Sequence, residues 1–170
     1  ELADYDPRER LGLVDCGDVA LTPGRIEDAF ERIEEAAFRI VDAGAIPIGF
    51  GGDGSVSLPL IRAASRRHPG LVVLHVDSHT DAQFTHAAEE QRVLASRSYH
   101  LGLRGSTYTA GAYEHGRGLG YNLITLNDFL GRGMADVVAE LREAFEGRPL
   151  YLSWDMDVFD PSVAPGVCTP

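Results

Sequence analysis

The sequence predicts an α/β fold in which a mainly parallel sheet is covered by helices on both faces. Stretches with a strand pattern alternate with stretches of helical periodicity along most of the chain, and this alternation is typical of parallel sheets. The run from Leu71 to Val76 is almost continuously apolar and β-branched, as expected of a strand that is buried on both faces. We therefore take this run as the central strand.

Before the central strand, two shorter apolar runs are predicted as strands, Leu11–Val14 and Ala45–Phe50. Between them, residues Arg25–Asp42 are predicted to form an amphipathic helix, because apolar residues recur three and four positions apart. A second helix is predicted over Ser55–Arg67, with Pro59 in its first turn or at a kink.

Beyond the central strand the alternation continues. Strands are predicted at Tyr99–Leu103, Leu123–Leu126 and Pro149–Trp154. Helices are predicted at Phe84–Leu94, Thr107–Arg117 and Met134–Phe145. No repeat or linker divides the chain, so we expect one domain over residues 1–170. Both of its ends are expected to be incomplete, because residue 1 is not Met and the chain stops directly after a motif.

The composition is that of a globular protein with an acidic surface. Hydrophobic residues make up 44% and charged residues 24%, and 26 acidic against 15 basic side chains give a formal net charge of −11. Nucleic-acid-binding surfaces are basic, so no nucleic-acid partner is expected. The sequence has no signal-peptide pattern and no run of 18 apolar residues, so no membrane association is expected. Cys16 and Cys168 form no spaced framework and are interpreted as free thiols, which predicts a cytoplasmic protein.

Ligand-type side chains follow the central strand at every second position. Asp77, His79 and Asp81 share one face as long as the chain stays extended. A second pair, Asp155 and Asp157, follows the last predicted strand. Parallel strands end at the same edge of a sheet, where open α/β folds place their sites, so we expect these five side chains to converge.

Four carboxylates in one crevice repel one another unless cations lie among them. Two divalent cations balance four carboxylates in charge. A mixture of carboxylate and imidazole donors suits manganese, and also zinc, nickel or iron. Two metal ions about 3.5–4 Å apart can hold a bridging hydroxide at neutral pH and direct it at an electrophilic carbon.

Other polar residues near these motifs have simpler interpretations. Asp160 precedes a proline and is interpreted as a turn former. Asp53 is interpreted as a hydrogen-bond partner of a ligand or as a structural loop residue. His75 lies inside the central strand and is interpreted as a satisfied core residue, one position off the ligand face. The cysteines have no His nearby in the sequence, which argues against thiol catalysis.

Three motifs resemble those of the ureohydrolases, the manganese-dependent arginase and agmatinase family, in order and in spacing. Residues 51–55, GGDGS, resemble the family's GGDHS loop, and residues 77–81, DSHTD, resemble its D-A-H-x-D motif. Residues 153–166, SWDMDVFDPSVAPG, resemble its S-x-D-x-D-x-x-D-P-x-x-A-P-G motif throughout. The DCGDV and HLGLRG segments look more like agmatinases than arginases.

The resemblance implies a three-layer α/β/α sandwich around an eight-stranded parallel sheet, assembled as a homo-oligomer, a trimer or hexamer. It implies two divalent metal ions, most often manganese, with nickel or zinc as alternatives, and Asp77 and Asp155 as ligands of both. His79 and Asp157 match ligands of one ion. Asp81 matches a ligand of the other and has the catalytic role of orienting the bridging hydroxide. The implied reaction is attack of that hydroxide on the carbon of a guanidino compound, which gives urea and an amine.

The sequence departs from the family pattern in three places. The metal-binding His of the GGDHS loop is Gly54 here, so one ion loses an imidazole. We expect this glycine to leave an open coordination position, and Gly54→His to raise the affinity for that ion. The segment after Asp81 is short and lacks the loop His that relatives use in substrate handling or proton transfer, which His86 does not match. The chain also stops before the family's carboxylate that binds the substrate guanidinium.

Two functions stay open on this basis. The first is an amidinohydrolase of the agmatinase type. The alternative is a non-catalytic homologue, a structural or regulatory subunit of a ureohydrolase-type oligomer, which Gly54 favours. The five retained ligands favour the enzyme, because clustered carboxylates are costly to keep without a metal. A phosphate-binding protein is not favoured, because the GGDGS loop lacks the Lys and the spacing of a P-loop.

Overall fold

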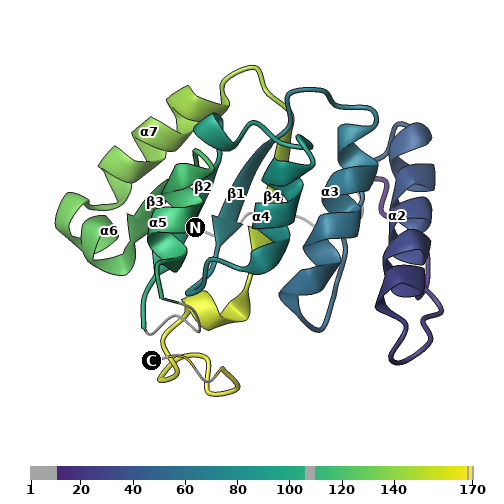
Figure 1. The fold of residues 1–170 in the computed structure, drawn as a ribbon, viewed down its shortest axis with the longest axis horizontal. Helices are drawn as coiled ribbons and strands as arrows, with labels where there is room; N and C mark the ends of the chain where they lie inside the picture. The colour runs from purple at the N-terminus through teal and green to yellow at the C-terminus, as the bar shows by residue number, and fades with distance from the viewer. Residues whose placement is uncertain (1–10, 106–109, 168, 170) are drawn as a thin grey trace.

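The computed structural model describes residues 11–105, 110–167 and 169 (Figure 1). A four-stranded sheet runs through its centre in the order β3-β2-β1-β4. Its strands are β1 Val72–Val76, β2 Tyr99–Leu103, β3 Asn122–Thr125 and β4 Leu150–Trp154. All three strand pairs are parallel, as the alternation of patterns predicts.

Helices cover both faces of this sheet (Figure 1). The α-helices are α2 Ile26–Asp42, α3 Ser57–Ser65, α4 Ala82–Glu89, α5 Ala112–Gly118, α6 Leu126–Arg132 and α7 Met134–Phe145. Short 3-10 turns are η1 Gly54–Val56, η2 Ala95–Arg97 and η3 Met156–Val158. The predicted three-layer α/β/α arrangement is confirmed.

Two apolar cores flank the sheet. Phe84 of α4 packs with Val73 on one face, within a cluster that also draws on α3. On the other face Val137 of α7 packs in a second cluster, against which Leu74 is placed. Neighbouring residues of β1 thus point to opposite cores, since side chains alternate along a strand. Fully burying a side chain such as Phe84, Val73 or Val137 contributes roughly 1.5–3 kcal/mol, so both faces of β1 are held by apolar packing.

Two predicted strands are wrong. Leu11–Val14 and Ala45–Phe50 form no ladder, and Ile46 and Phe50 of the second run are 90% and 97% exposed. An apolar run becomes a strand only where another strand satisfies its backbone N–H and C=O groups, and no described segment pairs with either run. The described sheet has four strands, where the family resemblance implies eight.

Helix α6 was not predicted. Its start is a capping box in which the backbone N–H of Asp128 donates to Thr125 Oγ1 at 3.1 Å, while the backbone N–H of Thr125 donates to Asp128 Oδ2 at 3.1 Å. The predicted helix Phe84–Leu94 begins earlier, at Ala82, and ends at Glu89. The predicted helix Thr107–Arg117 begins at Ala112, and its residues 107–109 lie outside the described part.

Two further expectations bear on the environment of the protein. Among the described residues, no helix combines the length and apolar character needed to cross a bilayer. Cys16 is exposed and unpaired, as predicted, whereas Cys168 lies outside the described residues.

Candidate metal centre

Two aspartates extend the ends of neighbouring strands. Asp77 directly follows β1, and its backbone N–H donates to the carbonyl of Leu101 on β2 at 3.0 Å. Asp155 directly follows β4, and its N–H donates to the carbonyl of Val76 at 2.9 Å. These bonds continue the sheet by one residue, so both carboxylates start from a fixed backbone. The two acidic motifs therefore meet at the carboxyl edge of one parallel sheet, as predicted.

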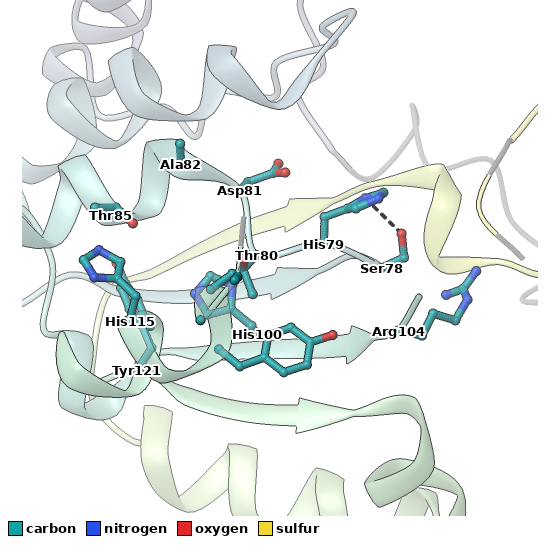
Figure 2. A pocket seen from close by; sticks show the side chains of 15 residues that line it. Ser78, His79, Thr80, Asp81, Ala82, Thr85, His100, Arg104, His115 and Tyr121 are labelled. Atoms are coloured by element: carbon teal, nitrogen blue, oxygen red, sulfur yellow. Dashed lines mark hydrogen bonds between the residues drawn. The ribbon is translucent and has the colours of Figure 1, made fainter. Parts of the chain in front are cut away.

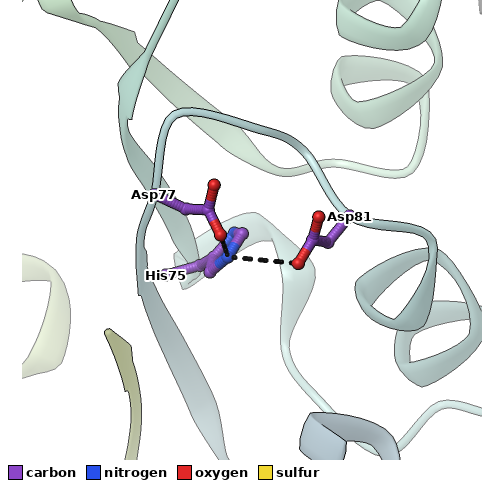
Figure 3. A group of neighbouring side chains, drawn as sticks. All are labelled: His75, Asp77 and Asp81. Carbon is purple, nitrogen blue, oxygen red and sulfur yellow. Dashed lines mark hydrogen bonds and ion pairs between the residues drawn. The ribbon is translucent and has the colours of Figure 1, made fainter. Parts of the chain in front are cut away.

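The first group of candidate ligands, which we name the His75 group, consists of His75, Asp77 and Asp81 (Figure 3). Its ligand atoms lie within 4.8 Å of one another. His75 Nε2 is 2.8 Å from Asp77 Oδ2 and 3.8 Å from Asp81 Oδ2. His75 and Asp77 are each 1% exposed, so this part of the group is buried in the core.

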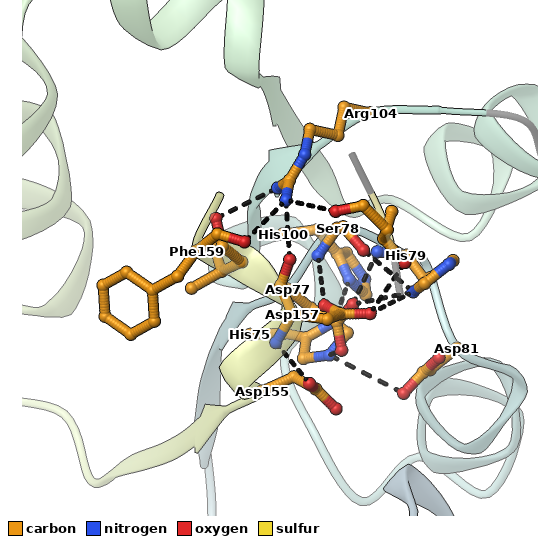
Figure 4. Close-up of polar contacts among 12 residues, drawn as sticks. His75, Asp77, Ser78, His79, Asp81, His100, Arg104, Asp155, Asp157 and Phe159 are labelled. Atoms are coloured by element: carbon orange, nitrogen blue, oxygen red, sulfur yellow. Dashed lines mark hydrogen bonds and ion pairs between the residues drawn. The ribbon is translucent and has the colours of Figure 1, made fainter. Parts of the chain in front are cut away.

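The second group, the His79 group, consists of Asp77, His79 and Asp157. His79 Nδ1 lies 3.3 Å from Asp77 Oδ1 and 2.9 Å from Asp157 Oδ2. The backbone N–H of Ser78 also donates to Asp157 Oδ1 at 3.1 Å, which ties the two acidic loops together (Figure 4). Asp77 belongs to both groups and places one carboxylate oxygen in each.

The prediction that His75 lies one position off the ligand face is wrong. His75 and Asp77 are two residues apart on a strand, so their side chains share a face. The alternation of His75, Asp77, His79 and Asp81 was the signal in the sequence that could have shown this. The prediction that His75 is buried and satisfied is confirmed, because its Nδ1 lies 2.9 Å from Nδ1 of the equally buried His100.

The protons on this histidine pair follow from the bonds. An ionised carboxylate only accepts, so Nε2 of His75 donates to Asp77 and Nδ1 of His75 accepts from His100 when both rings are neutral. Burial, with the neighbouring His75 as a further cause, lowers the pKa of His100 well below its usual range, which keeps that ring neutral. His75 thus fixes the orientation of the Asp77 carboxylate.

Asp155 stands apart from both groups. Its Oδ1 accepts the backbone N–H of Asp157 at 2.8 Å and caps the turn η3. It belongs to neither set of described ligand atoms within 4.8 Å, although it lies at the margin of the same cluster (Figure 4). Its role as a ligand of both ions stays a prediction.

A guanidinium group holds the loop after β4. Arg104, at the end of β2, donates from Nη1 to the carbonyl of Val158 at 3.0 Å. Its Nη2 donates to the carbonyls of Asp157 and Phe159 at 2.7 and 3.1 Å. Charge-assisted bonds of this kind are stronger than neutral ones, so Arg104 fixes the backbone that carries Asp157 (Figure 4). Sequence reasoning missed this contact, because HLGLRG gave no hint of its partner.

The comparisons with known proteins agree with this geometry. Residues 1–170 match the sequence profile described as the Arginase family. The chain belongs to the arginase family. It is 33% identical to the mitochondrial guanidino acid hydrolase of Homo sapiens over 177 residues, which cover 96% of this chain and 50% of that protein. It is 32% identical to an agmatinase of Proteus mirabilis, with coverage of 98% of this chain and 55% of that protein.

Solved structures of the arginase family confirm the fold class. Proclavaminate amidino hydrolase from Streptomyces clavuligerus aligns with a TM-score of 0.91 and 27% identity, covering all of this chain and 61% of that one. An arginase from Bacillus subtilis, at 19% identity, shares the fold with a TM-score of 0.81 and covers 92% of this chain and 65% of that one. The chain spans about half the length of the curated relatives it matches.

The space beside Gly54, where the family's GGDHS loop has a metal-binding His, is filled by other side chains. Gly54 faces the His75 group, but a Cβ on it would overlap Asp81 Oδ2 and Gln83 Nε2. The expectation of an open coordination position is therefore wrong, and a bare Gly54→His change would displace Asp81. Gln83, which sequence reasoning did not single out, fills the space and donates from Nε2 to Asp81 Oδ2 at 2.6 Å.

Two other acidic residues have the structural roles considered for them. Asp53 accepts the backbone N–H of Ser55 at 2.8 Å and caps η1. Asp160 accepts the N–H of Ser162 at 2.7 Å, which is the bond of a turn former. Neither carboxylate belongs to the two groups of candidate ligands in the described part of the chain.

The electrostatics of the His75 group favour a cation. Burial raises the pKa of Asp77, but the bond and charge of His75 and the backbone N–H of His79 outweigh it and leave the pKa lowered. Burial and the negative charge of Asp77 raise the pKa of Asp81. The carboxylates of Asp77 and Asp81 repel each other, and the imidazole of His79 lies 3.3 Å from Asp77 Oδ1. Divalent first-row ions prefer such a mixture of carboxylate and imidazole ligands, so the residues present fit such ions.

A cavity of about 650 Å³ opens beside this centre (Figure 2). Its lining includes Ser78, His79, Asp81, His100, Arg104 and Tyr121. Small-molecule sites are commonly of this size. The cavity reaches both groups of candidate ligands, through His79 of one and Asp81 of the other.

Proposed function

We propose that this arginase-family chain is part of an enzyme that hydrolyses a guanidino compound to urea and an amine with the help of two divalent cations, manganese in the first place. One observation carries the proposal: two His/Asp groups share Asp77 and adjoin one cavity. Relatives with the names guanidino acid hydrolase, guanidinobutyrase and agmatinase support the same substrate class.

Five side chains would hold the cations: Asp77, His79, Asp81, Asp155 and Asp157. When bound, such cations act as Lewis acids that make water nucleophilic at neutral pH and polarise a substrate. Asp77 serves both groups, and the N–H of His75 keeps its carboxylate from turning away. Asp81 is the proposed catalytic residue, because its carboxylate lines the cavity and can accept a hydrogen bond from the attacking water.

The charge of the molecule suits a guanidinium substrate. The formal net charge of −11 attracts cations, and the candidate ligands concentrate negative charge at one edge of the sheet. A planar guanidinium presents N–H donors only, so the carboxylate of Asp81 at the cavity wall is a suitable acceptor.

We also propose a homo-oligomer, a trimer or hexamer, in the cytoplasm. This part of the proposal rests on the resemblance to the ureohydrolases, which implies such an assembly. Light scattering on the full-length protein measures the assembly directly, and a monomer at micromolar concentration contradicts this part of the proposal.

A non-catalytic homologue is the second candidate, and Gly54 is the observation that favours it. Elemental analysis of full-length protein after manganese loading, read beside urea release from guanidino acids, agmatine and arginine, separates the two. The enzyme predicts about two ions per chain and urea from at least one compound. Bound metal without urea from the panel identifies the non-catalytic subunit. Absence of bound metal rules out the proposed centre.

A further inference from the structure

Gly54 and Gln83 lie far apart in the sequence but touch the same carboxylate. Gly54 begins η1, and Gln83 lies in the first turn of α4. A Cβ on Gly54 would overlap both Asp81 Oδ2 and Gln83 Nε2. Position 54 therefore accepts a side chain only if Asp81 and Gln83 move away, and the volume that such a side chain needs is filled by Gln83.

Asp81 is held in an unusual conformation. It is the N-cap residue of α4, yet its carboxylate makes no capping bond, and its φ of +30° lies where side chains other than glycine are rare. The carboxylate instead faces His75 Nε2 at 3.8 Å. Gln83 Nε2, at 2.6 Å from Asp81 Oδ2, is the described side chain that donates to it in this orientation.

We propose that Gln83 is a positioning residue that replaces a side chain at position 54 and holds Asp81 ready for the cation of the His75 group. Gly54 permits the close approach, and Gln83 supplies the hydrogen-bond donor, so the two residues act as one unit. A carboxylate has about four lone-pair sites, so Asp81 can accept from Gln83 and still bind a cation. The inference deepens the proposed function and rests on it for the cation.

If Gly54 and Gln83 act as one unit, removing the donor of Gln83 should lower the affinity for one cation. Gln83→Met keeps the length of the side chain and removes the donor, so the affinity for one of the two Mn²⁺ ions should fall about 10- to 100-fold, the usual effect of losing a partner of a metal ligand. The second ion should change less, because Gln83 does not contact the His79 group. The thermal midpoint of the metal-free protein should stay close to that of the unaltered protein.

The experiment is a Mn²⁺ titration by calorimetry on the full-length protein and its variants. Gln91→Ala is the control for Gln83→Met, because Gln91 is exposed just beyond the end of α4. Equal affinities in the Gln83→Met and unaltered proteins overturn the positioning role.

Coupling between the two residues is measured separately, without metal. Gly54→Ala should lower the thermal midpoint, because its methyl group displaces Asp81 and Gln83. In the background of Gln83→Ala the same change should cost less, since the Asp81 carboxylate can turn into the space that Gln83 leaves; contacting residues show such non-additivity. Gly52→Ala is the matched control, because no atom lies within 4 Å of a Cβ at that position.

The two failures are distinguishable. If the unaltered protein binds no Mn²⁺, the proposed function fails, and the thermal cycle alone then decides on the Gly54–Gln83 unit. Additive losses in that cycle overturn the unit. Binding of two ions by the unaltered protein, together with additive losses and an unchanged Gln83→Met affinity, supports the proposed function and rejects the inference.

Discussion

The loops after β1 and β4 carry similar acidic motifs but are held by different means. Asp77 is 1% exposed and directly follows β1, a strand that pairs on both sides, and its carboxylate accepts the N–H of buried His75. Strand β4 is at the edge of the described sheet, and Trp154 at its end is 55% exposed. There, Asp157 is fixed by polar contacts rather than by burial, from Arg104 to its backbone carbonyl and from the N–H of Ser78 to its carboxylate.

We divide the centre into a β1 half, the loop after β1, and a β4 half, the loop after β4. The difference between them indicates which half better tolerates substitution. In the β1 half, ligand geometry depends on core packing, so a substitution disturbs folding and cation binding together. In the β4 half, a polar contact from another strand sets the geometry, so cation binding can be lost while the fold persists. Four substitutions test this contrast, from the largest expected effect to the smallest.

Asp77→Asn should have the largest effect, because Asp77 is the carboxylate that both groups share. We expect the affinity for both Mn²⁺ ions to fall more than about 100-fold and urea release to disappear. The free energy of unfolding should also drop by about 1–3 kcal/mol, since buried His75 loses its charged acceptor. Calorimetric titration and denaturant unfolding measure the two effects. Retention of one tight site would mean that Asp77 is not shared.

Asp155→Asn tests the predicted ligand that lies outside both groups. If Asp155 binds both ions, metal content and urea release should fall together, with a smaller loss of stability than for Asp77→Asn because Asp155 is partly exposed. Elemental analysis beside a urea assay measures this. Unchanged stoichiometry would rule out the bridging role. Asp160→Asn is the control, and it should alter stability more than metal content.

Arg104→Met should mainly affect the His79 group, because Asp157, whose backbone carbonyl accepts from Arg104, belongs to that group. Loss of the bonds to the carbonyls of Asp157, Val158 and Phe159 should weaken the ion of the His79 group about 10-fold and leave the other ion nearly unchanged. Arg142→Met, at an exposed position of α7, is the control. Equal weakening of both ions would contradict a role of Arg104 that is specific to the His79 group.

Glu90→Gln should have the smallest effect and tests how α4 is fixed to α3. The bond from Arg62 holds the pKa of Glu90 below its usual value. A pKa lowered by folding contributes stability above the unfolded value near 4.5, and that stability is lost as pH falls through the folded value. The variant should therefore lose about 0.2–1 kcal/mol at pH 7 and match the unaltered protein in acid.

The control for that comparison is Glu35→Gln, which breaks the Arg39–Glu35 pair on the exposed face of α2. Its loss at pH 7 should be smaller than that of Glu90→Gln, because both partners are more exposed. A stability difference for Glu90→Gln that persists unchanged at low pH would contradict the assigned ion pair.

Local pattern was sufficient where the chain itself carries the physical cause. The apolar run of β1 predicted a strand buried on both faces, and the period of Met134–Phe145 predicted α7 with its bounds. Alternation after β1 placed His79 and Asp81 near Asp77, because a strand repeats every two residues. The same rule, applied to His75, would have placed it on the ligand side as well.

Tertiary structure decided what depends on a partner distant in sequence. Whether the apolar run Ala45–Phe50 forms a strand depends on whether a second strand pairs with its backbone N–H and C=O groups. The sequence of the run does not indicate whether such a strand is present. From the sequence, Gly54 was expected to leave an open coordination position, yet Gln83 occupies the space beside it. Contacts between such positions arise only when the chain packs, so a local pattern predicts which groups reach the edge of the sheet and the packed structure decides which of them touch.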